Sequence, residues 1–405
     1  MRVLFVTAVM PSHYFVMAPF AWALRAAGHE VYAATHPELV DTVAASGIPV
    51  VGAGPPVDFA RRYRERAGTG RPAAADPKTL FCDIADGMAD DVVRFARAWW
   101  PDVVVWEPSA LAGPLVAAVT GALSLRCPWG PDIVGRGLGR DNLPPEFGAL
   151  FERFGLRLAD VPEWWNLDAC PEAAQVPGMA RRLPVRYVPY SSAGRVPSGV
   201  LERPAGRPRI CVALGITMTE VAGPDGFFAP RVLDALCGLD VELVAAVVAG
   251  QRPLLGTVPQ GVRVVEDCAL HMLIPSCDLV IHHGGTGTML TAALHGVPQL
   301  ALSHSPDQRF FAVHLARTGA GSHLPAAEAG PAELRGLVGE LLGDPACRAA
   351  AAALRDAMTG LPTLADYIPV VERLAAGDGA ADALAPIAQH IPQLIQQLGQ
   401  QGAAS

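Results

Sequence analysis

The residues best suited to chemistry in this sequence lie in one ten-residue stretch, Leu279 to Thr288, which reads Leu-Val-Ile-His-His-Gly-Gly-Thr-Gly-Thr. An apolar run typical of a buried strand meets a glycine-rich corner, and helix-compatible sequence follows. At a strand-to-helix turn several backbone N–H groups lack partners, and the peptide dipoles leave about half a positive charge at the helix N-terminus. The stretch therefore predicts a cradle for an anion such as a diphosphate.

The side chains of this stretch have complementary predicted roles. Its glycines remove the side chains that would keep a diphosphate from the backbone, Thr286 or Thr288 can cap the helix, and His283 can donate from a neutral or cationic ring. The spacing is neither that of a dinucleotide-binding loop nor that of a P-loop with its lysine, which argues against ATP chemistry. A tight turn without a ligand is the alternative. The predicted diphosphate-binding residues are His283, Gly284, Gly285, Thr286, Gly287 and Thr288.

The composition is typical of a compact globular protein with two domains. The chain has 405 residues, of which 51% are hydrophobic and 17% charged, and its formal net charge is −8. This charge argues against a broad surface for nucleic acid or anionic membranes. No apolar run is long enough to span a membrane, and residues 1–6 resemble a first strand rather than a signal peptide. We expect a cytoplasmic protein whose eight scattered cysteines are reduced.

Strands alternate with helices through both halves of the sequence. This order predicts right-handed crossovers, and therefore an α/β protein with two tandem, doubly wound, Rossmann-like parallel-sheet domains. Residues 189–208 are rich in Pro, Ser, Gly and Arg and look like a linker. The predicted units are an N-terminal domain at 1–188, an interdomain linker at 189–208, a C-terminal domain at 209–375 and an Ala- and Gln-rich tail at 376–405.

Two segments leave alternatives open. Residues 54–78 are rich in Gly, Pro, Ala and Arg and predict either a mobile lid or a solvated insertion. The tail contains a weak helical stripe, which either packs on a neighbour or frays. The stripe consists of Ile387, Ile391, Leu394, Ile395 and Leu398.

Four segments resemble bacterial family 1 glycosyltransferases that decorate polyketide antibiotics, a family that includes the spinosyn, anthracycline and angucycline transferases. The segments are residues 1–6, 21–31, 186–190 and 282–288. The resemblance runs from residue 1 to about residue 375 and implies the GT-B fold, in which two Rossmann-like domains face each other across a cleft. It further implies an acceptor site in the N-terminal domain and a nucleotide-sugar site in the C-terminal domain.

The resemblance implies individual roles at the donor site. His283 matches the histidine that contacts the donor diphosphate, and residues 284–288 match the backbone cradle beside it. Segment 263–273 matches the part that holds the nucleobase, although Asp267 stands where many members have an aromatic residue. The implied positions are Gly215 and Thr217 near the phosphates, Val265, Cys268 and Leu273 at the nucleobase, and Asp307 and Gln308 at the sugar hydroxyls.

His13 and Glu107 form the implied catalytic pair. Both follow predicted strands, at the carboxyl edge of the sheet where ligands of parallel sheets bind. His13 matches the general base, which can take a proton from an acceptor hydroxyl because histidine titrates near pH 6.5. Glu107 matches the orienting carboxylate, usually Asp, that fixes the histidine tautomer. Without the resemblance, His13 is equally well an exposed loop residue.

The resemblance thus predicts an inverting transfer of a deoxysugar from a TDP-sugar to a hydrophobic aglycone. We see no Asp-x-Asp motif, so we expect no metal and no cofactor beyond the donor. The chain begins at its first strand, which predicts independence from an auxiliary activator protein, and a homodimer stays open. The candidate acceptor-binding aromatics are Phe81, Trp129 and Trp164, with loops 54–78 and 128–145 setting acceptor choice. Such aromatics are also ordinary core residues.

Two other functions compete with this one. A nucleotide-sugar 2-epimerase of the same fold would need further acid and base carboxylates in the cleft. A non-catalytic partner or scaffold would retain the fold without its chemistry. The presence of both His13 with Glu107 and an unbroken His-Gly-Gly-Thr-Gly-Thr motif argues against that loss.

Overall fold

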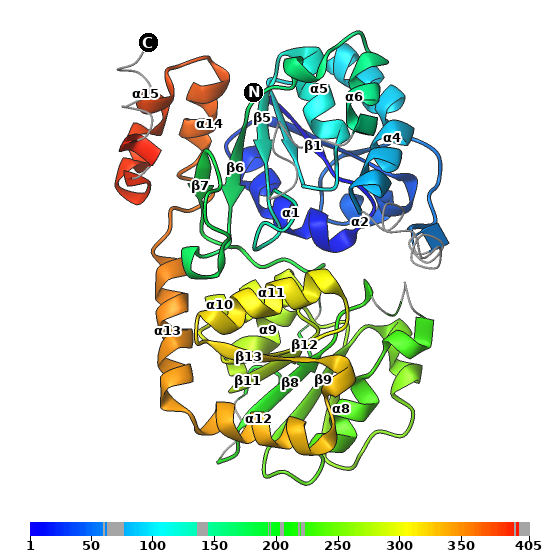
Figure 1. Ribbon diagram of the computed structural model, residues 1–405, viewed down its shortest axis with the longest axis vertical. Helices are drawn as coiled ribbons and strands as arrows, with labels where there is room; N and C mark the ends of the chain where they lie inside the picture. The colour runs from blue at the N-terminus through cyan, green and yellow to red at the C-terminus, as the bar shows by residue number, and fades with distance from the viewer. Residues whose placement is uncertain are drawn as a thin grey trace.

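Two parallel β-sheets, each between layers of helices, form two domains stacked along the long axis of the molecule (Figure 1). This confirms the predicted α/β class with two doubly wound domains. The computed structural model describes residues 1–59, 61–62, 77–135, 145–192, 194, 196–202, 206–217, 219, 223–392 and 394–396.

The first sheet has seven strands in the order β3-β2-β1-β4-β5-β6-β7, all parallel. The chain moves outward from β1 to β3 and then returns to β4 on the other side of β1. Side chains that follow β1 and β4 therefore meet at the point where the strand order reverses. The strands are β1 (Arg2–Val6), β2 (Glu30–Thr35), β3 (Val50–Gly52), β4 (Val103–Trp106), β5 (Leu123–Arg126), β6 (Trp164–Asp168) and β7 (Arg182–Pro184).

Helices cover both faces of this sheet because its strands alternate buried side chains between two apolar layers. Val3 and Phe5 of β1 pack toward helix α1, whereas Leu4 and Val6 pack toward the layer beneath α4, α5 and α6. The helices of this domain are α1 (Pro11–Ala26), α2 (Val40–Ala44), α4 (Pro77–Trp99), α5 (Ala112–Thr120) and α6 (Pro145–Glu152).

The second sheet has six parallel strands in the order β10-β9-β8-β11-β12-β13. Its order reverses between β8 and β11, so the residues after these two strands share one edge. The strands are β8 (Arg209–Ala213), β9 (Glu242–Val247), β10 (Val262–Glu266), β11 (Leu279–His282), β12 (Gln299–Ser303) and β13 (Gly321–Pro325).

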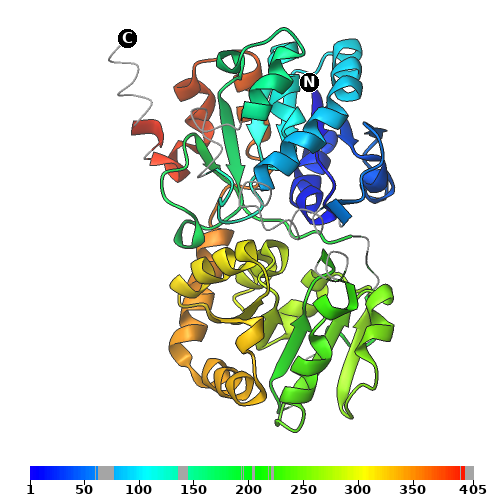
Figure 2. The same ribbon diagram turned by 45° about the vertical axis from the view of Figure 1, so that its right-hand side comes forward.

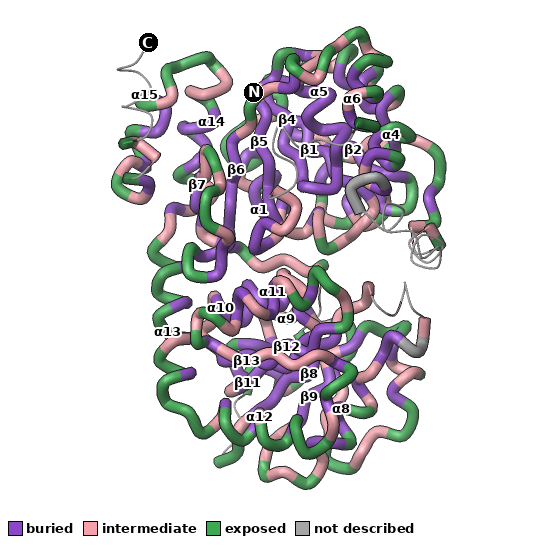
Figure 3. Tube along the Cα trace, viewed as in Figure 1, coloured by how far each residue is buried: buried purple, intermediate pink, exposed green. Residues whose placement is uncertain are grey.

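The helices of the second domain also lie on both faces of the sheet. Helices α8 and α12 contribute to one apolar layer, and α9 and α10 pack on the opposite face. Figure 3 shows the central strands of both sheets buried, the edge strand β13 intermediate, and the outer helix surfaces exposed. The helices are α8 (Ala229–Leu236), α9 (Leu270–Leu273), α10 (Thr286–Leu294), α11 (Pro306–Arg317), α12 (Pro331–Gly343) and α13 (Pro345–Thr359).

The C-terminal segment returns to the first domain. Helix α13 runs along the side of the second domain, and α14 (Ile368–Ala375) and α15 (Ala380–Leu384) lie beside β6 and β7 (Figures 1 and 2). The hydroxyl of Tyr367 donates to the Pro184 carbonyl at 2.8 Å, and Glu372 pairs with His29 at 3.1 Å. Helix α14, which lies within the predicted C-terminal domain at 209–375, therefore contacts the first domain.

The tail also packs rather than frays along its described part. Ile387 and Ile391 are 2% and 5% exposed, and Leu394 and Ile395 are partly buried against the same apolar layer. Of the two alternatives for the stripe, packing is thus the observed one for these four residues. Leu398 lies outside the described residues.

Strands β6, β7 and β13 are absent from the sequence-based expectations. Strand β6 reads Trp-Trp-Asn-Leu-Asp, and its polar residues Asn166 and Asp168 mask the apolar pattern of a buried strand. Both are buried because they bond to arginine side chains, Asn166 to Arg126 at 3.1 Å and Asp168 to Arg182 at 2.7 Å. Most of the predicted lid at 54–78, and residues 136–144 of the predicted acceptor loop, lie outside the described residues.

Candidate active site

His13 and Glu107 meet at the reversal point of the first sheet. His13 lies in the first turn of α1, seven residues after β1, and Glu107 directly follows β4. Nδ1 of His13 lies 3.3 Å from Oε2 of Glu107 and 3.2 Å from Oγ of Ser109. The sequence thus placed the pair at the correct edge, and the structure adds Ser109 between its members.

Glu107 is a fully buried carboxylate surrounded by donors. It accepts from the backbone N–H of Ala8 at 3.0 Å and of Ser109 at 2.8 Å, and from the Ser109 hydroxyl at 2.6 Å. Burial acts to raise the pKa of Glu107, but the charge of His13 and these bonds outweigh it and lower the pKa below its ordinary value. Glu107 is therefore ionised at neutral pH.

The surroundings of Nδ1 fix the tautomer of His13. Ser109 donates its proton to Glu107, so both oxygens near Nδ1 present lone pairs to it. A proton on Nδ1 satisfies them, which leaves the lone pair on Nε2. The His13 side chain is 17% exposed, so the ring that contains this nitrogen is partly accessible.

Trp129, a candidate acceptor residue, contacts this pair directly. Its indole ring stacks on the His13 ring with centroids 3.9 Å apart and planes 18° apart. Its Nε1–H donates to Oε2 of Glu107 at 3.1 Å. The other two candidates have packing positions: Trp164 lies edge-on to Trp106 at 5.4 Å, and Phe81 packs against the apolar layer beneath α4.

The glycine-rich stretch forms the predicted strand-to-helix corner at the carboxyl end of β11. Gly284 has φ +89°, which favours glycine, and a Cβ there would lie 2.8 Å from the Gln308 carbonyl oxygen. Its N–H is not available to a ligand, because it donates to Nδ1 of His282 at 3.0 Å. Glycine is therefore required at position 284 by the turn itself, and its place beside a diphosphate stays a prediction.

Helix α10 presents its N-terminus at this corner. The first helical bond is that from the Met289 N–H to the Gly285 carbonyl, so the N–H groups of Thr286, Gly287 and Thr288 precede the hydrogen-bonded ladder. Gly285 is the N-cap residue and no side chain caps the helix, which corrects the predicted threonine cap. These N–H groups remain for an anion.

The His283 ring is held between two glycines. A Cβ on Gly215, which follows β8, or on Gly285 would overlap the ring. These glycines are therefore required by His283 itself, in addition to any ligand. Burial lowers the pKa of His283 to about 4, and the charge of Asp307 and the Ala213 carbonyl offset this only in part. His283 is neutral at physiological pH, so the cationic form allowed by the sequence does not apply.

The other residues predicted to bind the donor differ in how far they are exposed. Val265 and Leu273 are 3% and 0% exposed in an apolar cluster, whereas Cys268 is partly exposed, so Cys268 has the accessible surface among the three. Asp267 has φ +49° and accepts from the Ala249 N–H at 3.0 Å. Thr217 is half-buried two residues beyond Gly215.

Asp307 and Gln308 lie in the first turn of α11, beside the cradle. Oε1 of Gln308 accepts from the N–H groups of His304 at 2.9 Å and Ser305 at 3.3 Å, so this oxygen caps the helix. Asp307 is exposed and accepts from the Ser305 hydroxyl at 2.5 Å. The sugar-binding role of both residues stays a prediction.

We call the His13–Glu107 pair the base half-site and the glycine-rich corner at the N-terminus of α10 the donor half-site. The two half-sites belong to different domains, and residues beside them are in contact. Gly130, next to Trp129, faces Thr286 so closely that a Cβ on Gly130 would lie 2.6 Å from Cγ2 of Thr286. The Tyr187 hydroxyl, in the chain leaving the first domain, donates to the Gly287 carbonyl at 3.4 Å. The histidine–carboxylate pair and the diphosphate cradle therefore belong to one site.

Three residues at this site were not predicted: Ser109, His282 and Gln251. Gln251 donates to the Gly215 carbonyl at 2.7 Å and is 5% exposed. His282 precedes His283 in the motif, and its position at the end of an apolar strand was a signal for burial. Nothing in the sequence around Gln251 indicates that it reaches Gly215, 36 residues earlier.

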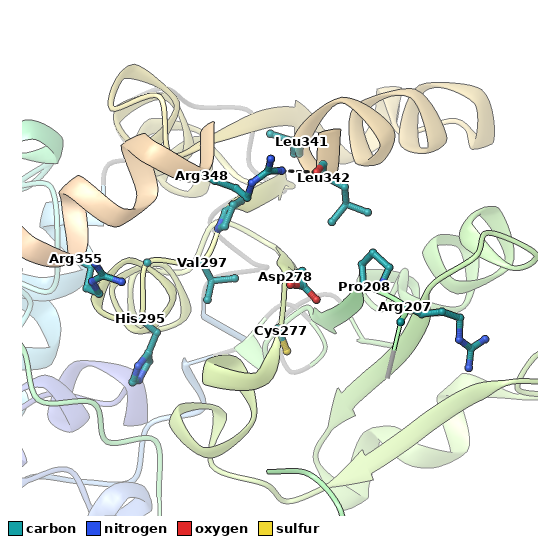
Figure 4. A pocket seen from close by; sticks show the side chains of 13 residues that line it. Arg207, Pro208, Cys277, Asp278, His295, Val297, Leu341, Leu342, Arg348 and Arg355 are labelled. Atoms are coloured by element: carbon teal, nitrogen blue, oxygen red, sulfur yellow. Dashed lines mark hydrogen bonds between the residues drawn. The ribbon is translucent and has the colours of Figure 1, made fainter. Parts of the chain in front are cut away.

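A cavity elsewhere in the second domain does not belong to this site. It has a volume of about 620 Å³ and is lined by Pro208, Asp278 and Pro298, which directly precede β8, β11 and β12 (Figure 4). It therefore lies at the amino edge of the sheet, opposite the cradle. Its Arg348 donates to the Leu342 carbonyl at 2.6 Å.

Metal ligands do not cluster within the described residues: no group of three or more His, Cys, Asp or Glu side chains is arranged to hold a metal ion there. In the same part of the chain, no helix has the length and apolarity needed to cross a membrane.

The glycine-rich corner of the second domain lies against the loop beside the His13–Glu107 pair of the first, an arrangement that suits a nucleotide-sugar glycosyltransferase of the GT-B class. The chain matches the family described as erythromycin biosynthesis protein CIII-like, with the N-terminal domain of the family at residues 22–215 and its C-terminal domain at residues 230–375. It belongs to this family of antibiotic glycosyltransferases.

Relatives with similar sequences and structures cover nearly the whole chain. The 10-deoxymethynolide desosaminyltransferase of Streptomyces venezuelae is 38% identical, over 93% of this chain and 97% of the relative. The tylactone mycaminosyltransferase of Streptomyces fradiae is 35% identical, over 93% of both chains. The spinosyn rhamnosyltransferase SpnG, solved with thymidine diphosphate, has a TM-score of 0.80 and 31% identity, over 92% of this chain and 100% of that chain.

Proposed function

We propose that this glycosyltransferase moves a deoxysugar from a TDP-sugar to a polyketide-type aglycone with inversion at the anomeric carbon, and that His13 is its general base. The observation that supports this most directly is the contact of Gly130 with Thr286, which joins the His13 half-site to the diphosphate cradle. A base and a leaving-group site on opposite sides of one cleft suit an in-line displacement.

The base half-site suits deprotonation of an acceptor hydroxyl. With Nδ1 of His13 directed at Glu107 and Ser109, Nε2 takes the proton as the acceptor oxygen attacks. The ionised Glu107 then stabilises the imidazolium across 3.3 Å. The general-base role of histidine in such sites contributes about 10²-fold to 10⁴-fold in rate.

The donor half-site suits departure of a nucleoside diphosphate. Charge grows on the diphosphate as the anomeric bond breaks, and the N–H groups at the N-terminus of α10, which no side chain caps, suit the stabilisation of this charge. His283 is neutral, so it contributes a hydrogen bond rather than a charge. We propose that these groups act without a metal ion.

The substrate class is proposed from the relatives. Three relatives are named as a desosaminyltransferase of 10-deoxymethynolide, a mycaminosyltransferase of tylactone and a rhodosaminyltransferase of aklavinone. Two related structures were solved with thymidine diphosphate. A third was solved with the spinosyn aglycone. A TDP-deoxysugar and a hydrophobic polyketide acceptor are therefore the substrates to test first.

The 2-epimerase and scaffold alternatives have less support. Near the described His13, the buried carboxylate is Glu107, which already accepts several hydrogen bonds and is held ionised. It is thus poorly suited to donate a proton to a sugar carbon. A scaffold needs no ionised carboxylate beside a tautomer-fixed histidine.

The test is a transfer assay with purified protein, TDP-deoxysugars and a panel of macrolide and anthracyclinone aglycones, followed by mass spectrometry. We expect a product heavier by one sugar, equal yields with and without EDTA, and an anomeric configuration opposite to that of the donor by NMR. Activity lost in EDTA and restored by Mg²⁺ would refute metal independence. A retained configuration would refute the single-displacement mechanism.

A further inference from the structure

Trp129, like Ser109, contacts both His13 and Glu107. Its ring covers one face of His13 at 3.9 Å, and its Nε1–H donates to the same Glu107 oxygen, Oε2, that faces Nδ1 of His13. The tryptophan thus constrains the histidine ring and the carboxylate that orients it at the same time.

The hydrogen bonds of His13 are long and do not by themselves fix the orientation of its ring. The distances of 3.2 Å to Ser109 and 3.3 Å to Glu107 are at or beyond the long end for a hydrogen bond. Rotation of the imidazole would exchange a ring carbon for Nδ1 at these oxygens and would turn Nε2 away from the acceptor. The stacked indole opposes rotations that tilt the imidazole out of the parallel arrangement. Its Nε1–H also holds Oε2 of Glu107 in place, and a turned ring would face this oxygen with a carbon and lose the hydrogen bond.

The loop that holds Trp129 is anchored within the first domain. The carbonyl of Gly130 accepts from Nε2 of Gln175 at 3.2 Å, and the N–H of Asp132 donates to Oε1 of the same side chain at 2.7 Å. Asp132 also forms a buried ion pair with Arg126 at 2.5 Å. These bonds keep the backbone on the C-terminal side of Trp129 in one conformation.

The same loop is bounded from the other side by the second domain. Gly130 is buried against Thr286, the first residue of α10, without room for a methyl group. The position of Trp129 therefore depends on the spacing between the base half-site and the diphosphate cradle.

We infer that Trp129 is a positioning residue that holds His13 in the tautomer and orientation needed for proton abstraction, and that Gly130 ties this geometry to the contact between the two domains. The inference rests on the proposed function, because orientation of His13 matters only if His13 is the base. It is separate from the acceptor-binding role predicted for Trp129 from sequence, which stays a prediction.

The test observes the His13 ring directly and needs no acceptor. In the full chain labelled with ¹⁵N-histidine, NMR at about pH 8, where ordinary histidines are neutral, reports which ring nitrogen holds the proton. The His13 signals are assigned by their absence in His13→Gln. We expect the Nδ1–H tautomer alone in the wild type, a mixture with Nε2–H in Trp129→Leu, and a smaller admixture in Trp129→Phe, which retains an aromatic face but loses the donor.

Two further variants separate positioning from general disturbance. Trp22→Leu changes a partly exposed tryptophan on the same helix as His13 and should leave the His13 signals unchanged. Gly130→Ala touches no atom of His13, yet it should move these signals because the loop must shift away from Thr286.

Titration of TDP into the same proteins by calorimetry distinguishes this inference from the proposed function. We expect Trp129→Leu to bind TDP within about threefold of the wild type, because its side chain lies in the base half-site. A single Nδ1–H tautomer retained in Trp129→Leu and Trp129→Phe would overturn the positioning role. Unchanged His13 signals in Gly130→Ala would overturn the link to the second domain. Absence of TDP binding to the wild type would instead overturn the proposed function.

Discussion

The chemistry proposed for His13 depends on a carboxylate that is buried yet ionised. Glu107 has no exposed surface, and a carboxylate without partners would become protonated there. The charge of His13, together with the hydrogen bonds from His13 and Ser109, reverses that tendency and lowers its pKa. The neighbours of one carboxylate therefore decide the protonation state on which the base depends.

Replacement of His13 by Gln tests the base without disturbing the donor site. Gln cannot take the proton, so kcat should fall by about 10²-fold to 10⁴-fold. TDP binding should be unchanged, because the cradle lies in the second domain. Transfer kinetics and calorimetry check the two parts, and a fall in kcat of less than about tenfold would remove His13 from the role of base.

At the scale of single residues, the sequence predicted identities better than interactions. The types and strand positions of His13, Glu107 and His283 indicated their neighbourhood. Ser109 was missed because the turn that brings its hydroxyl back onto Glu107 depends on backbone geometry after β4. Trp129 was named for an apolar ligand, and only the folded loop shows that it faces His13.

At the scale of elements, the corner between β11 and α10 depends on a buried histidine. Nδ1 of His282 accepts the Gly284 N–H, so this ring must be neutral, and burial lowers its pKa to about 3. The left-handed Gly284 is thereby fixed, and with it the direction in which α10 presents its N–H groups.

Two substitutions of His282 separate the effect of its side-chain packing on stability from the effect of its Nδ1 acceptor. His282→Leu leaves the Gly284 N–H without a partner and should destabilise the protein by about 1–3 kcal/mol. His282→Asn can place an oxygen near the position of Nδ1 and should lose less. Urea unfolding measures both free energies, and equal losses in the two variants would show that the acceptor is unimportant.

The same residue predicts a pH dependence of stability. The folded pKa near 3 lies below the unfolded value of 6.5, so above pH 6.5 both states are neutral and no penalty exists. As the pH falls from 6.5 toward 3, the unfolded chain binds a proton that the folded chain rejects, and stability is lost at up to about 1.4 kcal/mol per pH unit. Urea unfolding at pH 7 and pH 5 should show a smaller loss in His282→Asn than in the wild type. Parallel pH dependences would contradict the assignment.

Element prediction succeeded where the strands were apolar and failed where they were polar. Strands β1, β4, β8 and β11 contain continuous runs of buried residues and were placed from sequence. Strand β6 escaped because Asn166 and Asp168 are polar, and their burial depends on arginines that lie elsewhere in the chain.

At the scale of the whole molecule, a segment near the C-terminus returns from the second domain to the first. Helices α14 and α15 leave the second domain and cover part of the first, near β6 and β7 (Figure 1). The sequence showed the apolar stripe but did not indicate what it packs against. Such a pattern predicts which residues are buried, and not which element covers them. The sequence therefore did not show that α14, inside the predicted domain at 209–375, contacts the first domain.

Truncation of Ile387 to Ala tests the contribution of this segment. The side chain is 2% exposed, so its loss should cost about 2–5 kcal/mol through lost burial and a residual cavity. Ile395→Ala is a matched control with a partly buried side chain and should cost less. Thermal unfolding compares the two, and equal small effects would show that the tail does not stabilise the fold.

The measurement that most directly tests the shared site is calorimetric titration of TDP, without metal, into the wild type and Gly287→Ala. A Cβ at Gly287 meets no protein atom within 4 Å, so the variant should fold normally and obstruct only a diphosphate at the α10 N-terminus. Gly336→Ala, on helix α12 and equally unobstructed, is the control. We predict TDP binding to the wild type and the control and its loss in Gly287→Ala. Undiminished binding to Gly287→Ala, or no binding to the folded wild type, would contradict a diphosphate site at this helix.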